Sequence, residues 1–173
     1  MDSISQQFDK AVNNVLKDIY YYVIPQLVEF GIKMVNEVIP SQAEYRNLTG
    51  NTLTSYAFGV YYNGQLELMG FNTNSEPAIR NKLIKGETIV NFEDYDGDLR
   101  IFFRANIDTD GQLGTNTSMS FLKDYHPKSQ FGIVFTTGTE YSAYLENVRE
   151  LNVLSDAYDY SRSSFINSFR PIK

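Results

Sequence analysis

The chain has 173 residues, of which 42% are hydrophobic and 21% charged, and this is enough apolar material for one domain with its own core. Its 15 basic and 21 acidic residues give a net charge of -6, which disfavours a nucleic-acid-binding surface, since such surfaces are usually basic. Cysteine is absent and there is one histidine, so disulfides, cysteine nucleophiles, thiolate metal sites and multi-histidine metal sites are excluded.

No apolar run approaches the ~20 residues that a bilayer span needs. The first seven residues have neither the cationic start nor the apolar stretch of a signal peptide. We therefore expect a soluble protein that is made in the cytoplasm and has no membrane partner.

The first forty residues predict two helices. Apolar residues recur at spacings of four and three from Ser3 to Val23, which is the pattern of a helix with one apolar stripe. The residues of this stripe are Ile4, Phe8, Val12, Val15, Ile19 and Val23. Pro25 lacks a backbone donor, so we expect it to end or kink this helix and to begin a second one, which Pro40 closes.

The middle of the chain, residues 49–136, predicts an antiparallel sheet built from hairpins. A short helix is expected within residues 49–56, before the first strand. The pair Asn63-Gly64 stands between two β-prone runs, 56–62 and 65–71, and suits the type I′ turn of a hairpin.

A second hairpin is expected from the runs 88–92 and 99–107, which an acidic turn joins. Residues 77–85 predict a loop or a loosely packed short helix. The segment 108–117 is rich in turn formers and predicts a flexible linker, and 131–136 predicts another strand.

A helical pattern runs from Thr139 to the end of the chain, with an interruption near Asn152. Ser155 or Asp156 is expected to cap the last helix, which stops before Pro171. The expected fold is therefore α+β in one domain, residues 1–173: N-terminal amphipathic helices over 1–40, the antiparallel sheet with long loops over 49–136, and C-terminal helices over 139–170 packed against the sheet.

Alternating acids resemble the first ligands of a calcium-binding loop. These residues are Asp94, Asp96 and Asp98. The pattern then fails, because Leu99 stands where the loop needs glycine and Ala105 where it needs glutamate. A hairpin turn explains these acids more simply, and we predict no metal site.

His126 lies near Asp124 and is the one side chain that invites a catalytic reading, as a general base. A surface histidine beside a proline is the simpler interpretation. No nucleophile elbow and no glycine-rich phosphate loop are present in the sequence. We predict no catalytic residue, no cofactor and no enzymatic activity.

Aromatic residues are abundant, with 13 Tyr and 12 Phe but no Trp. Neighbouring tyrosines cannot all face one core, so some must reach a surface. Tyrosine is enriched at protein interfaces because its ring buries apolar area while its hydroxyl stays hydrogen-bonded. The candidates for an interface are Tyr20, Tyr21, Tyr61 and Tyr62, and simple surface cover of the strands is the alternative.

Two motifs, in this order along the chain, resemble the tail-completion or head-to-tail joining proteins of tailed bacteriophages. The motif positions are Thr49, Gly50, Asn51 and Leu53, and then Tyr141, Ala143, Tyr144 and Glu146. In that family the first motif leads into an antiparallel sheet and the second precedes a C-terminal helix. The tyrosine-rich and asparagine-rich style is similar to that of Bacteroides phages, including the crAss-like group.

The resemblance implies a structural virion protein that forms a ring in a phage neck or tail, after assembly in the host cytoplasm. Its partners would be copies of itself, other neck or tail proteins (portal, adaptor or tail rings), and DNA that passes without specific binding. Acids lining the lumen would repel phosphates, although solvated turns explain them as well. The candidate lumen acids are Asp94, Asp96, Asp98, Asp108 and Asp110. The alternative function is a soluble, non-viral binding module or a small hydrolase-like enzyme.

Overall fold

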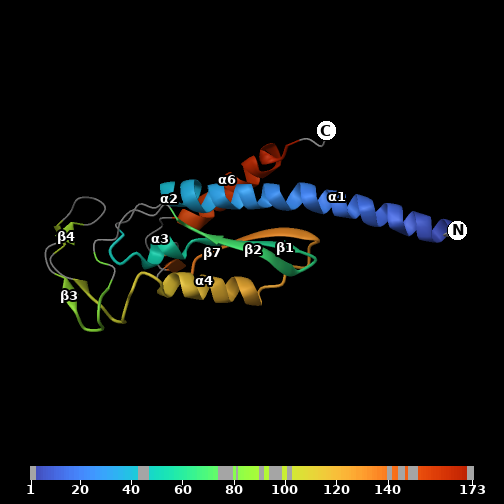
Figure 1. Cartoon of the computed structure of the whole chain (residues 1–173). Coiled ribbons are helices and arrows are strands. Elements are labelled where there is room, and N and C mark those ends of the chain that lie inside the picture. The colour runs from blue at the N-terminus through green and yellow to red at the C-terminus, as the bar shows by residue number, and fades with distance from the viewer. Residues whose placement is uncertain are drawn as a thin grey trace.

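The chain is an α+β protein in which helices lie on both faces of a three-stranded antiparallel sheet (Figure 1). A computed structural model describes residues 3–42, 47–73, 80, 82–89, 92–93, 99–100, 103–139, 142–143, 147 and 152–170. The expected fold class is confirmed.

The longest element is helix α1 (Ile4–Lys33), which begins with a capping box. The Gln6 amide donates to Ser3 Oγ at 3.3 Å, and the Ser3 amide donates to Gln6 Oε1 at 2.8 Å. The helix continues through a π-helical turn, η1 (Met34–Val38), into the short helix α2 (Ile39–Ser41). The N-terminal residues therefore form one almost unbroken rod.

The prediction that Pro25 ends the first helix and begins a second one is wrong, because α1 continues through it. A proline inside a helix leaves the carbonyl four residues earlier without its amide partner. Here that carbonyl belongs to Tyr21, and both residues lie on the exposed side of α1, where water can hydrogen-bond to it. The Gln26 side chain also donates to the carbonyl of Tyr22 at 2.9 Å, which stabilises the same turn.

The central sheet has the strand order β2-β1-β7. Its strands are β1 (Ala57–Tyr62), β2 (Gln65–Phe71) and β7 (Phe131–Thr136), and both pairings are antiparallel. Asn63 and Gly64 both have positive φ, 48° and 78°, as a type I′ turn requires. The first hairpin and the strand at 131–136 are therefore confirmed.

The main core lies between α1 and one face of this sheet. Phe30 of α1 meets Phe135 of β7 with ring centroids 6.2 Å apart, and Phe58 of β1 lies beside Phe135 at 6.5 Å. Gly31 makes this approach possible, because a Cβ atom there would overlap the Phe58 ring. Phe58 is consequently almost fully buried.

Helix α4 (Leu113–Asp124) covers the other face of the sheet. The prediction of a flexible linker over 108–117 is wrong for its second half, which is the first part of this helix. Gly114 packs so closely against the short helix α3 (Asn51–Ser55) that a Cβ atom would touch the Asn51 carbonyl. Tertiary contact thus overrides a local sequence of weak helix formers. The short helix expected within residues 49–56 is confirmed by α3.

The second expected hairpin is also present, as two small antiparallel pairs. Strand β3 (Thr88–Ile89) pairs with β6 (Phe103–Arg104), and β4 (Phe92–Glu93) pairs with β5 (Leu99–Arg100). The alternative of a helix over 77–85 fails in its described part, since Leu83 forms an isolated β-bridge with Thr109.

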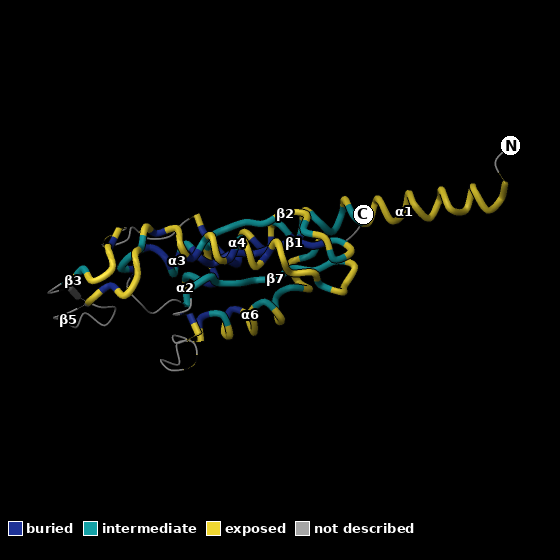
Figure 2. Tube along the Cα trace, turned by 90° about the horizontal axis from the view of Figure 1, so that it is seen from below, coloured by how far each residue is buried: buried dark blue, intermediate teal, exposed yellow. Residues whose placement is uncertain are grey.

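The last helix is α6 (Val153–Ser168), which packs along α1. It begins after Asn152, whose φ is 49°, so the prediction that Ser155 or Asp156 caps it is wrong. Its end before Pro171 is as expected. Figure 2 shows that the N-terminal half of α1 extends well beyond all of these elements.

Candidate interaction surface

The part of α1 that leaves the body carries an uncovered apolar stripe. We call residues 4–19 of α1 the arm. Within it Ile4 is 88% exposed, Phe8 67% and Val15 56%. The arm stripe consists of Ile4, Phe8, Val12, Val15, Leu16 and Ile19, and all six are exposed. These are the residues that the sequence placed on one stripe, except that Leu16 joins them and Val23 packs against the core.

The same face of α1 is covered by α6 farther along the helix. Phe30 meets Phe165 of α6 with ring centroids 5.2 Å apart, and Lys33 lies 6.0 Å from the centre of the Tyr160 ring. The backbone amide of Arg170 donates to Gln26 Oε1 at 2.6 Å. α6 therefore runs antiparallel to α1 and covers this face from Gln26 onward.

The bare and covered parts form one continuous face, because the spacing of three and four does not break between them. The face runs through Phe8, Val12, Val15, Ile19, Tyr22, Gln26, Glu29 and Lys33. Residues at these spacings lie above one another on a helix. The second half of this series has the same spacing in the sequence, although the predicted stripe ended at Val23.

A cluster of tyrosines fixes the base of the arm. The Tyr20 hydroxyl donates to Glu67 Oε2 of β2 at 2.7 Å, and this hydrogen bond is the main reason that the pKa of Tyr20 is raised above its ordinary value of 10.0. The Tyr20 ring meets the rings of Tyr62 at 5.0 Å and Tyr21 at 5.4 Å, both edge to face. A hollow of about 310 Å³ lies beside them, lined also by Asn13, Leu16 and Lys17.

Tyr61 does not belong to this cluster, and its prediction as an interface residue is wrong. Its side chain is fully buried and faces α4, where its hydroxyl donates to the carbonyl of Leu122 at 2.7 Å. Burial raises its pKa, and nearby Tyr125 adds to the effect. Successive residues of a strand face opposite sides of a sheet, so Tyr62 points toward α1 instead.

The two motifs of the resemblance belong to the segments 49–56 and 137–146, and the described parts of these segments contact each other. Ser55 Oγ is 2.7 Å from Thr137 Oγ1, which in turn is 2.9 Å from Ser142 Oγ. Ser118 of α4 donates to the Ser55 carbonyl at 2.5 Å. Together these hydrogen bonds tie α3 and α4 to the segment that follows β7.

The motif positions themselves serve mainly the fold. Gly50 begins α3 with a φ of 83°, and Leu53 is part of the core. Thr49 is half-buried, Asn51 is buried, and Ala143 is exposed. Asn51 Oδ1 has no hydrogen-bond partner among the described residues. Three further motif positions, Tyr141, Tyr144 and Glu146, lie outside the part of the chain that the structure describes.

Two of the five candidate lumen acids are described, and both stabilise turns. Asp108 Oδ1 accepts from the Lys85 amide at 2.7 Å, and Asp110 Oδ1 accepts from the Gln112 amide at 2.8 Å. Both side chains are exposed. The other three, Asp94, Asp96 and Asp98, fall outside the described residues.

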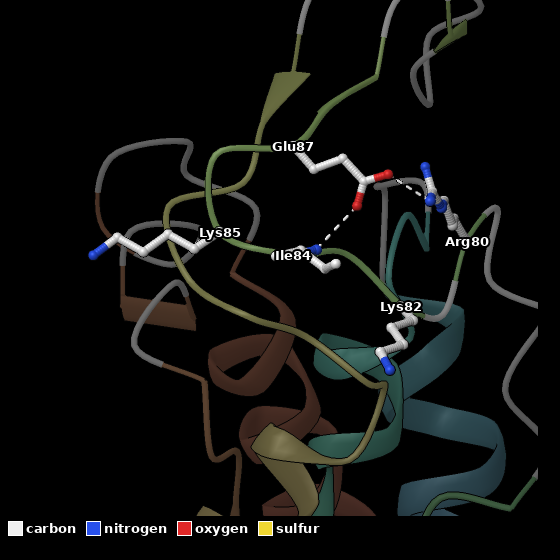
Figure 3. Close-up of a pocket in the computed structure, with 5 residues that line it drawn as sticks. All are labelled: Arg80, Lys82, Ile84, Lys85 and Glu87. Atoms are coloured by element: carbon white, nitrogen blue, oxygen red, sulfur yellow. Dashed lines mark hydrogen bonds and ion pairs between the residues drawn. The ribbon is translucent and has the colours of Figure 1, made fainter.

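A larger hollow, of about 590 Å³, lies beside the β3–β6 pair and was not expected from the sequence. Figure 3 shows its lining, in which Lys82 and Lys85 point away from each other. Arg80 is paired with Glu87 at 2.5 Å. The cations therefore do not converge on one point, as the binding of an anion would require.

His126 is exposed, and its Nδ1 lies 3.0 Å from the carbonyl oxygen of Gly64. The ring thus contacts the backbone of the β1–β2 turn. Within the described ranges, no three acidic or histidine side chains gather as a metal site would need. In the same part of the chain, no helix has the length and apolar character to cross a membrane.

Comparisons with known proteins identify no relative of the chain, so the interpretation of this surface depends on its geometry. No protein-family model, curated protein or solved structure matches the chain.

Proposed function

We propose that the protein is a structural virion protein that forms an oligomeric ring in the neck or tail of a tailed bacteriophage. In this role it joins head and tail components and lines or supports the DNA conduit. Its partners are copies of itself and adjoining portal, adaptor or tail rings. It acts through contact between subunits and performs no bond chemistry.

The observation that carries this proposal is the exposed arm stripe. Six apolar side chains follow one face of α1 over a helix length of about 22 Å. A monomeric protein rarely exposes a continuous apolar patch larger than a few hundred Å², and a larger patch marks a contact with another molecule. A protein whose most distinctive surface is an apolar arm is suited to assembly with other proteins.

Two further features support a phage ring within the wider class of assembly proteins. The first is the resemblance, whose two motif segments meet through the contact of Ser55 with Thr137 and so belong to one structural unit. The second is the net charge of -6, which suits a conduit that DNA must pass without adhering.

Mass spectrometry of purified virions tests the proposal directly. The expected result is that the chain copurifies with the portal and tail proteins in constant ratio, in several copies per particle. Its absence from particles that contain the other neck and tail proteins would exclude the proposal and favour the non-viral binding module.

A phage that carries Val15→Lys tests the contribution of the arm. Val15 is exposed in the single chain, so the charge should leave the fold intact while it disrupts contacts of the stripe. We expect fewer complete particles and a lower titre. Asn14→Lys is the matched control, because Asn14 is exposed on the same turn but lies off the stripe.

A further inference from the structure

We infer that the arm stripe pairs with the same stripe of a second copy of this chain, as two antiparallel helices about a two-fold axis between residues 13 and 14. The pairing removes from water the apolar side chains that a single chain exposes. It goes beyond the ring proposed above. The copies in a ring of cyclic symmetry all point the same way and share no two-fold contact, so the pair is the form of the protein outside the ring.

The spacing of the stripe is the same in both directions along the helix. Phe8, Val12, Val15 and Ile19 follow at spacings of four, three and four. In the proposed register Phe8 faces the partner's Ile19, and Val12 faces the partner's Val15. The larger side chains Phe8 and Ile19 meet at the two ends of the contact, and valines meet valines at its centre.

The length of the bare face matches the length of one partner arm. α6 covers this face of α1 from Gln26 onward, where the Arg170 amide binds Gln26 Oε1. In the proposed register the partner's Ser3, which caps its helix, lies level with Ile24. One partner helix therefore fills the bare part of the face and ends where α6 begins.

The charged side chains of the arm are placed so that the pair brings no like charges together. Lys10 and Lys17 lie on the side of the arm away from the stripe. In an antiparallel pair each flank of a helix meets the same flank of its partner. Asp9 then neighbours the partner's Leu16, and Asp18 the partner's Ala11. Within the described part of the arm, no like charges meet across the pair.

The area is sufficient for a specific contact. The six exposed side chains of one copy and the six of the other bury on the order of 1,000 Å² in total. This total is near the lower limit for a specific interface. The bodies of the two copies lie at opposite ends of the pair. The partner's Tyr20, where its body begins, is level with Gln7, so the bodies leave the stripe accessible.

Light scattering coupled to size exclusion tests the oligomeric state of the full chain. We expect a dimer at about 100 µM protein. Val15→Lys should raise the dissociation constant at least about tenfold, while Asn14→Lys should leave it unchanged, and circular dichroism should show the same helix content in all three proteins. A monomeric wild type, or equal effects of the two substitutions, would overturn the inference.

Spin labels test the antiparallel direction, and the absence of cysteine from the chain allows single labels. Gln7→Cys and Asn14→Cys are seven residues apart and so lie on the same side of the helix, and both sites are exposed. In the antiparallel pair the two labels at residue 14 are almost level, whereas the two at residue 7 are offset by about 20 Å along the axis. Equal label-to-label distances in the two variants would show a parallel pair and refute the inference.

The outcomes separate this inference from the ring. A monomer in solution, together with the chain in virions, refutes the pair and leaves the ring. A ring-sized particle in solution refutes the pair and favours the ring. A dimer of a chain that is absent from virions supports the pair and excludes the ring.

Discussion

At the scale of single residues, Glu87 links the turn that precedes β3 to Arg80. The Ile84 amide donates to Glu87 Oε2 at 3.0 Å, and Arg80 pairs with the other oxygen. The hydrogen bond from Ile84 is the main reason that the pKa of Glu87 lies below its ordinary value of 4.5. Partial burial opposes this effect and Arg80 adds to it.

We expect Glu87→Gln to reduce the loss of stability in acid. A lowered pKa means that the carboxylate stabilises the folded state fully above its ordinary pKa, and that this contribution is lost as the pH falls through the lowered value. Glutamine still accepts from Ile84 but does not titrate. Urea unfolding between about pH 6 and pH 3 should show a steeper decline for the wild type than for the variant. Parallel curves would contradict this prediction.

Tyr61→Phe should destabilise the fold although it preserves the ring. The substitution leaves the buried carbonyl of Leu122 without the hydroxyl that now donates to it at 2.7 Å. A loss of about 1–2 kcal/mol in the free energy of unfolding is expected. The control is Tyr125→Phe on an exposed ring, for which urea unfolding should show little change.

At the scale of elements, Gly138 decides how closely the end of β7 approaches α4. A Cβ atom at this position would overlap the Gly114 carbonyl and approach the Ser118 amide nitrogen within 2.6 Å. Both obstacles are backbone atoms, which cannot move aside as a flexible side chain can.

Gly138→Ala should therefore lower the free energy of unfolding by about 1–3 kcal/mol. Gly132→Ala in β7 is the matched control. Its Cβ atom would meet Ser129 Oγ at 3.1 Å, and that hydroxyl can rotate away. Similar melting temperatures for the two variants would show that the packing of α4 on β7 is looser than described.

The elements that sequence reasoning predicted well are those that local chemistry determines. Asn63-Gly64 dictates its turn whatever surrounds it, because both residues accept positive φ. α4 was missed because Gly114 favours a helix only once Ser55 and the Asn51 carbonyl pack against it. Pro25 was misread because its effect depends on whether water reaches the Tyr21 carbonyl, which is a tertiary property.

The candidate surface was predictable in part. The spacing from Ile4 to Ile19 identified an apolar stripe. Whether the stripe is buried depends on how far the rest of the protein extends along α1, and the local sequence does not show this distance. Tyr20 and Tyr62 are interface candidates in the sequence because each stands next to another tyrosine. In the structure their rings meet at the base of the arm. Tyr61 was misassigned because the sequence alone does not show which face of the sheet α4 covers.

At the scale of the whole molecule, the arm and the body are separable in stability. Val23 and Ile24 pack against the core, whereas residues 3–12 are exposed. Deletion of residues 1–12 should therefore leave the melting temperature within about 2 °C of the full chain. The measurement belongs at low protein concentration, where association does not contribute.

Deletion of residues 1–24 is the corresponding control. It removes the Tyr20 hydroxyl from Glu67 and two side chains from the core, so the melting temperature should fall clearly. A large effect of the shorter deletion would mean that the arm folds back onto the body in solution.

The continuity of α1 through Pro25 has a mechanical consequence. A 30-residue helix without a break is about 45 Å long, with Phe8 near its free end, Tyr20 bonded to Glu67 at the base of the arm, and Phe30 in the core. A force that tilts the tip must either bend the rod or shift the Phe30, Phe58 and Phe135 rings. Displacement of the tip is therefore opposed both by the stiffness of the helix and by the core packing of α1.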